Sequence, residues 1–203
     1  KGVMTPRGSD GYMRSYSIIP GTYKVKFSYG EYEKIDSFKV LMDPRSNVAM
    51  DEYETKNELL SKIDSDIDNI YASLITLQNV RNQLNELNGR IGIDEEYNGI
   101  IDLSKKTMKL IDETESQLIS PRQKTFQDVI NFRNQLDSQL YDLLNTVNGN
   151  IPPLTGGEKV RYVDLHQKWV TIKVGVDTII DNVSEINNLL KQNSVPYISG
   201  GGK

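Results

Sequence analysis

The sequence predicts a mainly helical α+β protein, in which a small antiparallel β element precedes an elongated up-down-up-down four-helix bundle. Three observations support this prediction. Apolar residues alternate with polar ones between residues 22 and 42, as in half-buried strands. From about Met50 onward they recur every three or four positions, as on amphipathic helices. Breaks containing Gly or Pro divide this second region into four stretches.

Length and charge limit the classes of protein to which this chain can belong. The 203 residues suffice for one large domain or two small ones, and we divide them into a β element at 1–46 and a bundle at 47–203. Lys and Arg total 24 against 28 Asp and Glu, and both signs are mixed along the helical stretches. This balance argues against a nucleic-acid partner. No apolar run approaches the roughly 20 residues of a membrane span, so none is expected.

Cysteine is absent and His166 is the only histidine. The composition therefore excludes a disulfide framework and leaves a structural zinc site without ligands. We expect no metal or cofactor. Residues 1–11 contain Gly, Pro and Ser without periodicity, which is typical of a linker. Since this segment has no initial methionine, we expect the chain to be a fragment of a longer precursor.

The β element is predicted from two alternating segments, GTYKVKF at 21–27 and DSFKVLMD at 36–43. Gly30, between them, can supply the positive φ of a hairpin turn. A lone hairpin is only marginally stable in water. We therefore expect its apolar face to be covered by another strand, for example at residues 13–19, or by the end of the helical part. A partial β-sandwich would satisfy the same requirement.

Four helices are predicted, at about 50–90, 94–119, 126–148 and 158–193. Asn88-Gly89, Pro121 and Asn148-Gly149 mark the ends of the first three. Their short connections imply up-down-up-down packing, which would place Ser120 and the end of the last helix beside the hairpin. The apolar residues of the first helix form a stripe along one side. Heptad positions of the other three helices in the same chain, which include Ile101, Leu140 and Trp169, are expected to pack against it.

Two stretches carry a family resemblance. IIPGTYKVKFSYGEYEKIDSFKVLMDPR, residues 18–45, resembles the Pro-Gly-Thr-Tyr strand pair that closes bacterial proteins with VPS10/sortilin-like, BNR-type repeats, often labelled glycosyl hydrolase-like. The stretch from Leu165 to Ser199 is similar to the last helix of that family, with a Trp near its start and an Asn-x-x-Leu pattern before a proline. The resemblance implies a β-propeller followed by sandwich strands and a helical tail. The Asp-box of propeller blades is lacking, so no active-site residue can be transferred.

The expected function is that of a non-catalytic C-terminal structural or interaction module of an exported propeller protein, secreted or in the periplasm or cell envelope. Its expected partner is the upstream β-propeller of the same protein, with a protein, a glycan or a second copy bound through a helix face as further options. The leading alternative is an accessory region of a glycan-acting glycoside hydrolase whose active site lies upstream. A free-standing adaptor bundle is the third interpretation, and whether the parent is an enzyme stays open.

Four tyrosines are the candidate contact residues. Tyr29 and Tyr32 flank the predicted hairpin turn, and Tyr12 and Tyr16 lie upstream of it. Exposed tyrosines can stack on a carbohydrate or insert into a protein partner, although hairpin tyrosines also commonly cover a sheet edge.

Three other motifs have ordinary structural interpretations. The acidic alternation at 64–68 lacks the glycine of a calcium loop and falls within a predicted helix. His166 follows core-facing Leu165 and lies three residues before Trp169, so it is expected to be partly buried and hydrogen-bonded to a neighbour. No nucleophile motif accompanies it, which argues against a general base. Trp169 and Tyr162 lie on the core stripe. We therefore predict no catalytic residue.

Overall fold

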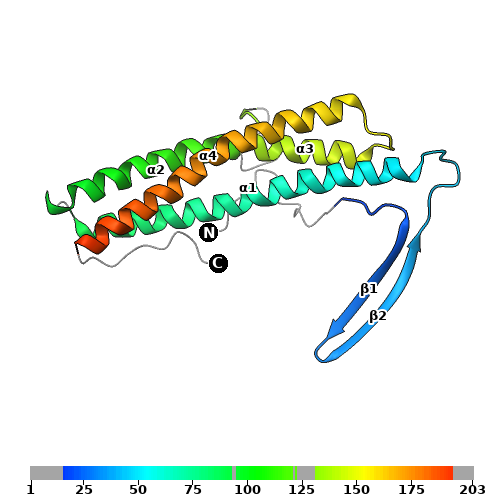
Figure 1. The fold of residues 1–203 in the computed structure, drawn as a ribbon, viewed down its shortest axis with the longest axis horizontal. Helices are drawn as coiled ribbons and strands as arrows, with labels where there is room; N and C mark the ends of the chain where they lie inside the picture. Colours follow the sequence, from blue (N-terminus) through cyan, green and yellow to red (C-terminus); the bar gives the residue numbers. More distant parts are fainter. Residues whose placement is uncertain (1–15, 93–94, 121, 123–130, 194–203) are drawn as a thin grey trace.

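The computed structural model describes residues 16–92, 95–120, 122 and 131–193. Within these ranges the protein is mainly helical, and two strands precede the helices (Figure 1). The predicted fold class, a hairpin followed by a four-helix bundle, is confirmed. The elements are β1 (Gly21–Tyr29), β2 (Tyr32–Val40), α1 (Met50–Ile91), the 3-10 helix η2 (Glu95–Tyr97), α2 (Asn98–Leu118), α3 (Leu136–Gly149) and α4 (Gly156–Gln192).

The two long helices, α1 and α4, extend along the whole bundle, whereas α2 and α3 lie one after the other beside them (Figure 1). The buried side chains form two clusters. In one, the first half of α1 packs against α3 and the beginning of α4; in the other, the second half of α1 packs against α2 and the remainder of α4. Each part of the bundle is therefore three helices thick.

The order of helix directions differs in one respect from the predicted alternation. α3 runs in the same direction as α2 (Figure 1). Ile119 packs in the cluster beside α3, so the adjoining Ser120 lies midway along the bundle. The end of α4 lies far from the hairpin, because Leu190 shares a cluster with Ile91 at the end of α1. Helix length explains the difference: α2 has 21 residues and α1 has 42, so α2 alone covers only half of α1.

Two of the four predicted helices have the expected ends, and the other two begin later than predicted. α2 begins at Asn98, whereas the prediction placed its start at about 94. α1 and α4 are within two residues of the expected positions. The predicted third helix began at Phe126, but residues 131–135 are not helical and α3 begins at Leu136. Residues 123–130, and the predicted N-cap Asp94, lie outside the described residues.

A capping box begins α4. The Oγ1 atom of Thr155 accepts a hydrogen bond from the backbone N–H of Glu158 at 3.2 Å, and the Glu158 carboxylate accepts one from the Thr155 N–H at 2.7 Å. The sequence Thr-Gly-Gly-Glu has the spacing of this motif. The side-chain amide of Asn150 donates a hydrogen bond to the Glu158 carboxylate at 2.7 Å. This bond links the segment that follows α3 to the first turn of α4.

The hairpin projects from the bundle near the beginning of α1 (Figure 1). In the described part of the chain the sheet has two strands, and residues 16–19 form no third one. The expectation that another strand or the bundle covers the apolar face is therefore wrong for these residues, since that face is exposed to solvent. The apolar alternation identified the strands correctly, but it did not show what lies against them.

Candidate functional site

The register of the hairpin gathers its aromatic residues on one side. Tyr23 lies opposite Phe38, and Tyr29 lies opposite Tyr32, with a turn at Gly30, whose φ is 57°. Opposite residues of an antiparallel pair share a face, and every second residue along a strand returns to it. The face with these residues is called the aromatic face, and it comprises Tyr23, Val25, Phe27, Tyr29, Tyr32, Lys34, Asp36, Phe38 and Val40.

Most apolar side chains of the aromatic face are open to solvent. The exposed fraction ranges from 46% for Phe38 to 79% for Tyr29. The intermediate values belong to Val25, Phe27 and Tyr32. Single exposed apolar residues are normal on protein surfaces, but a contiguous set typically marks an interaction site. This face is the strongest candidate for a functional surface in the described residues.

Contacts between rings pre-order the aromatic face. Tyr23 and Phe38 stack with centroids 5.8 Å apart, and Phe27 meets Tyr32 edge-on at 6.5 Å. The Tyr23 hydroxyl donates a hydrogen bond to the Ile19 carbonyl at 2.7 Å, just before the strand begins. Side chains fixed in this way lose less entropy when a partner binds.

The opposite face of the hairpin is mainly polar. It presents Lys24, Lys26, Glu33 and Lys39, and Lys26 pairs with Glu33 at 2.6 Å across the strands. Ile35 is the apolar exception on this face. The two faces therefore differ in chemistry, and only the aromatic face resembles the inner side of a sheet layer.

Both long edges of the hairpin are also open. Each strand pairs only with the other in the part of the chain that the structure describes, so both carry outward-facing backbone N–H and C=O groups. Such edges readily accept a further strand. The hairpin thus offers two kinds of contact, namely apolar side chains on one face and backbone hydrogen bonds along its edges.

A short connection joins the hairpin to the bundle. After β2, the Asp43 carboxylate accepts hydrogen bonds from the backbone N–H and the guanidinium of Arg45, at 2.8–3.0 Å. These bonds lower the pKa of the Asp43 carboxyl, the side-chain bond having the larger effect. Before β1, the backbone N–H of Ser17 donates a hydrogen bond to Oδ1 of Asn148, at the end of α3, at 2.8 Å.

The four candidate tyrosines occupy different environments. Tyr29 and Tyr32 lie at the exposed tip of the hairpin. Tyr16 instead packs, partly buried, against the core cluster beside α3. Tyr12 lies outside the described residues. Val25, Phe27 and Phe38 were assigned to a buried face from the sequence, so their exposure adds them to the candidate surface.

His166 and the acidic segment of α1 meet in the bundle. The Nδ1 atom of His166 lies 2.8 Å from a carboxylate oxygen of buried Asp66, and the Tyr162 hydroxyl lies 3.4 Å from the same nitrogen. The predicted hydrogen bond to a neighbour is present. The predicted partial burial is wrong, because the His166 side chain is 46% exposed and its neighbours Leu165 and Trp169 occupy the core face of α4. Residues 64–68 are helical, and Trp169 lies in the core as expected. Among the described residues, no group of three metal-ligating side chains comes together.

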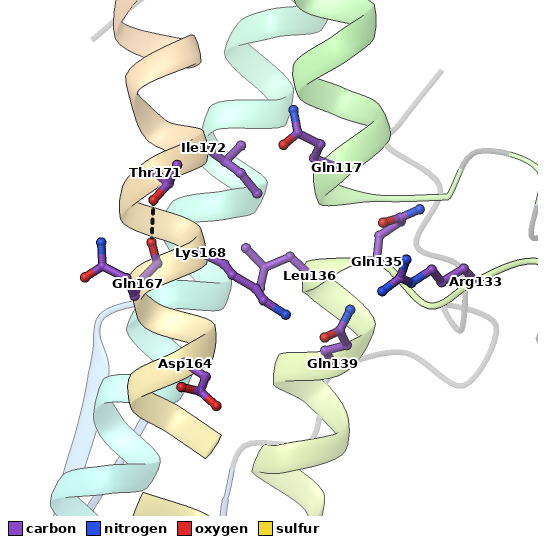
Figure 2. Close-up of a pocket in the computed structure, with 10 residues that line it drawn as sticks. All are labelled: Gln117, Arg133, Gln135, Leu136, Gln139, Asp164, Gln167, Lys168, Thr171 and Ile172. Carbon is purple, nitrogen blue, oxygen red and sulfur yellow. Dashed lines mark hydrogen bonds between the residues drawn. The ribbon is translucent and has the colours of Figure 1, made fainter. Parts of the chain in front are cut away.

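A hollow lies where α2 ends and α3 begins, next to the first half of α4 (Figure 2). Its volume is about 500 Å³. Leu136 and Ile172 provide apolar surface, and the other lining residues are polar. They are Gln117, Arg133, Gln135, Gln139, Asp164, Gln167, Lys168 and Thr171. The charged and amide side chains are two cations, one acid and four amides. They include no nucleophile and no acid–base pair, so we assign no reaction to this hollow.

Comparison of the chain with protein-family models, curated proteins and solved structures finds no match. The helices within the described residues include none with the length and apolarity needed to cross a membrane. The assignment of function therefore rests on the hairpin and on the resemblance of residues 18–45.

Proposed function

We propose that the chain is a non-catalytic interaction module, in which the helical bundle supports a hairpin that docks on a β-rich partner. The observation that carries this proposal is the solvent-exposed aromatic face of a hairpin whose strands pair with no other described strand. A nine-residue strand pair with five large apolar side chains in water lacks the burial that normally stabilises such an element. A partner sheet would supply that burial.

The chemistry of the hairpin favours a β-sheet as the partner surface. Alternation places apolar side chains on one face only, as in a strand pair that covers one side of a sandwich. The open edges add backbone hydrogen bonds, which a helical partner cannot supply. Polar residues on the opposite face, such as Lys24 and Lys26, would remain in water.

The partner that we propose is a β-propeller or its adjoining sandwich strands, upstream in the same exported protein. The Pro-Gly-Thr-Tyr and Asp-Pro-Arg motifs, at residues 20–23 and 43–45, support this choice because the resembling strand pair follows a propeller. A secreted, periplasmic or cell-envelope location belongs to the same proposal. The sequence upstream of Lys1 is accordingly expected to contain Asp-box repeats.

Binding between separate polypeptides tests the proposal. Residues 1–203 and the β-rich region upstream would be produced individually and titrated by calorimetry. We expect binding, and a loss of roughly tenfold or more in affinity for the double variant V25S/F27S, because both side chains leave the aromatic face. The matched control is K24S/K26S on the polar face, which should bind within about twofold of the parent chain.

Two results would contradict the proposal. One is absence of binding in the presence of a correctly folded helical bundle, as judged by circular dichroism. The other is equal loss of affinity in the two double variants, since the aromatic face would then have no special role. Turnover of aryl glycosides by residues 1–203 alone would separately refute the non-catalytic assignment.

A further inference from the structure

A second exposed apolar surface lies on α4, distant in sequence from the hairpin. Four valines there have exposed fractions between 44% and 63%. Together with one glutamine they occupy successive heptad positions, three and four residues apart. We call this set the valine stripe, and it consists of Val160, Val163, Gln167, Val170 and Val174.

The valine stripe faces away from the core of its own bundle. The buried residues of the same helix segment include Leu165, Trp169 and Val176. At 100° per residue, these lie on the side of α4 opposite the stripe. The stripe is therefore not a margin of the core face, and the intramolecular bundle does not cover it.

The composition of the valine stripe differs from that of the next helical turns of α4. Continuing the same spacing along α4 leads to Asp177 and Asp181, which are exposed charges as expected on a solvated helix face. The five stripe positions carry no charge. Valine is also among the weaker helix formers, so an exposed helix face has little reason to contain four of them unless their side chains are packed.

We infer that a second copy of this chain packs its α4 in parallel against the valine stripe, forming a short two-stranded coiled coil. Each valine would then meet its equivalent, and Gln167 would pair with Gln167 of the second copy through side-chain hydrogen bonds. A single polar residue in such a seam fixes register. The seam would end at Val174, because the next positions would bring Asp177 and Asp181 against their own copies.

Charges beside the stripe favour the parallel orientation. Lys159 and Asp164 flank it five residues apart, which is the spacing of an ion pair between neighbouring helices of a parallel coiled coil. Neither side chain makes an ion pair with another described residue of its own chain. An antiparallel arrangement that pairs Val163 with Val174 would set Val160 against Asp177. The pairing of Lys159 with Asp164 thus favours an arrangement with like ends together.

Sedimentation equilibrium of the full chain tests this inference. We expect a concentration-dependent species of twice 23.0 kDa. The variant V163K/V170K should raise the dimer dissociation constant by roughly tenfold or more, because it places charges in an apolar seam. Ile75 on α1 is also an exposed apolar residue, at 53%, so I75K is the matched control and should dimerise like the parent.

A charge exchange tests the orientation. Either K159D or D164K alone should weaken the dimer, and the double variant K159D/D164K should restore it. The inference is overturned by a monomer at all concentrations, by a trimer, or by a dimer that V163K/V170K leaves intact. Loss of the dimer in the hairpin variant V25S/F27S would also overturn it, because association would then occur through the aromatic face.

Discussion

Asp66 shows how a single buried charge links two helices. The residue is 5% exposed, and its carboxylate lies 2.8 Å from Nδ1 of His166. A carboxylate oxygen only accepts hydrogen bonds, so this nitrogen carries the proton. The variant H166A should lower the free energy of unfolding by about 1–3 kcal/mol, because a buried acceptor loses one of its donors. Urea denaturation measures this change.

His166→Asn is the control for that substitution. Its side-chain amide can place an N–H near the position of Nδ1, so we expect it to recover part of the stability lost in H166A. Equal stability of H166A and the parent chain would show that Asp66 obtains sufficient hydrogen bonding elsewhere, from Tyr162 or from water.

Tyr162 has an unusual titration in the same cluster. Burial, followed by the charge of Asp66 and a hydrogen bond to it, raises the pKa of the Tyr162 hydroxyl from 10.0 to about 12. The folded state therefore holds this proton more tightly than the unfolded state. The stabilisation is complete below pH 10 and is lost as the pH rises from 10 toward 12. A pH titration of phenolate absorbance measures this pKa. The difference between the parent chain and Y162F should show one tyrosine that titrates near pH 12.

At the scale of the helix, Glu158 determines how α4 begins. Burial alone would raise the pKa of its carboxyl, but hydrogen bonds from Thr155 and Asn150 and the charge of Lys56 outweigh it, so the pKa lies below the ordinary 4.5. The resulting stabilisation is complete above pH 4.5 and is lost as the pH falls through the folded-state pKa. The variant E158Q should cost about 1 kcal/mol at neutral pH.

Thermal melts at several pH values measure this contribution. The melting temperatures of E158Q and the parent should converge as the pH falls well below 4.5, since protonated Glu158 resembles Gln. A difference that is constant with pH would indicate that the charge of Glu158 is unimportant to the cap.

The contact between α2 and α4 depends on the absence of a side chain. A Cβ added at Gly175 would lie 2.9 Å from Oγ1 of buried Thr114. Although alanine favours helix formation by up to about 1 kcal/mol, the clash with a stiff β-branched neighbour should dominate. We expect G175A to destabilise the protein by about 1–3 kcal/mol. In a double-mutant cycle T114A should relieve most of this loss, and simple additivity would contradict the clash.

The two strands and the two long helices, α1 and α4, were predictable in position because each has a local periodic pattern, whereas the start of α3 was predicted ten residues too early. The stripe of α1 and the alternation of β1 and β2 needed no knowledge of their partners. The direction of α3 was not predictable, since it depends on where the chain leaves α2 and re-enters a helix. The exposure of Val25 and Phe27 was missed because alternation identifies an apolar face without identifying its cover. The valine stripe was present as a second heptad pattern in α4, but only the core pattern was assigned.

For the molecule as a whole, the division of the core into two clusters has a measurable effect. Among the described residues, the two clusters have α1 and α4 in common, and α2 contributes only its last residue, Leu118, to the cluster beside α3. The variant L140A should cost about 2–5 kcal/mol. Native-state hydrogen exchange should show its effect mainly in α3 and the first half of α1, with less effect in α2.

The reciprocal variant, I111A, should mainly affect α2 and the second half of α1. Ile111 and Leu140 are both fully buried, so the two substitutions are matched in burial. Uniform loss of protection along the chain in both variants would show that the bundle opens as one cooperative unit.

Because α2 and α3 together make one pass, the chain crosses the bundle three times and leaves it opposite its point of entry. A bundle with an even number of passes would return the chain to where it started. With 42 residues in α1, at about 1.5 Å per residue, entry and exit are separated by about 63 Å. Inserting or deleting whole turns in all three passes should therefore change this separation without altering the hairpin.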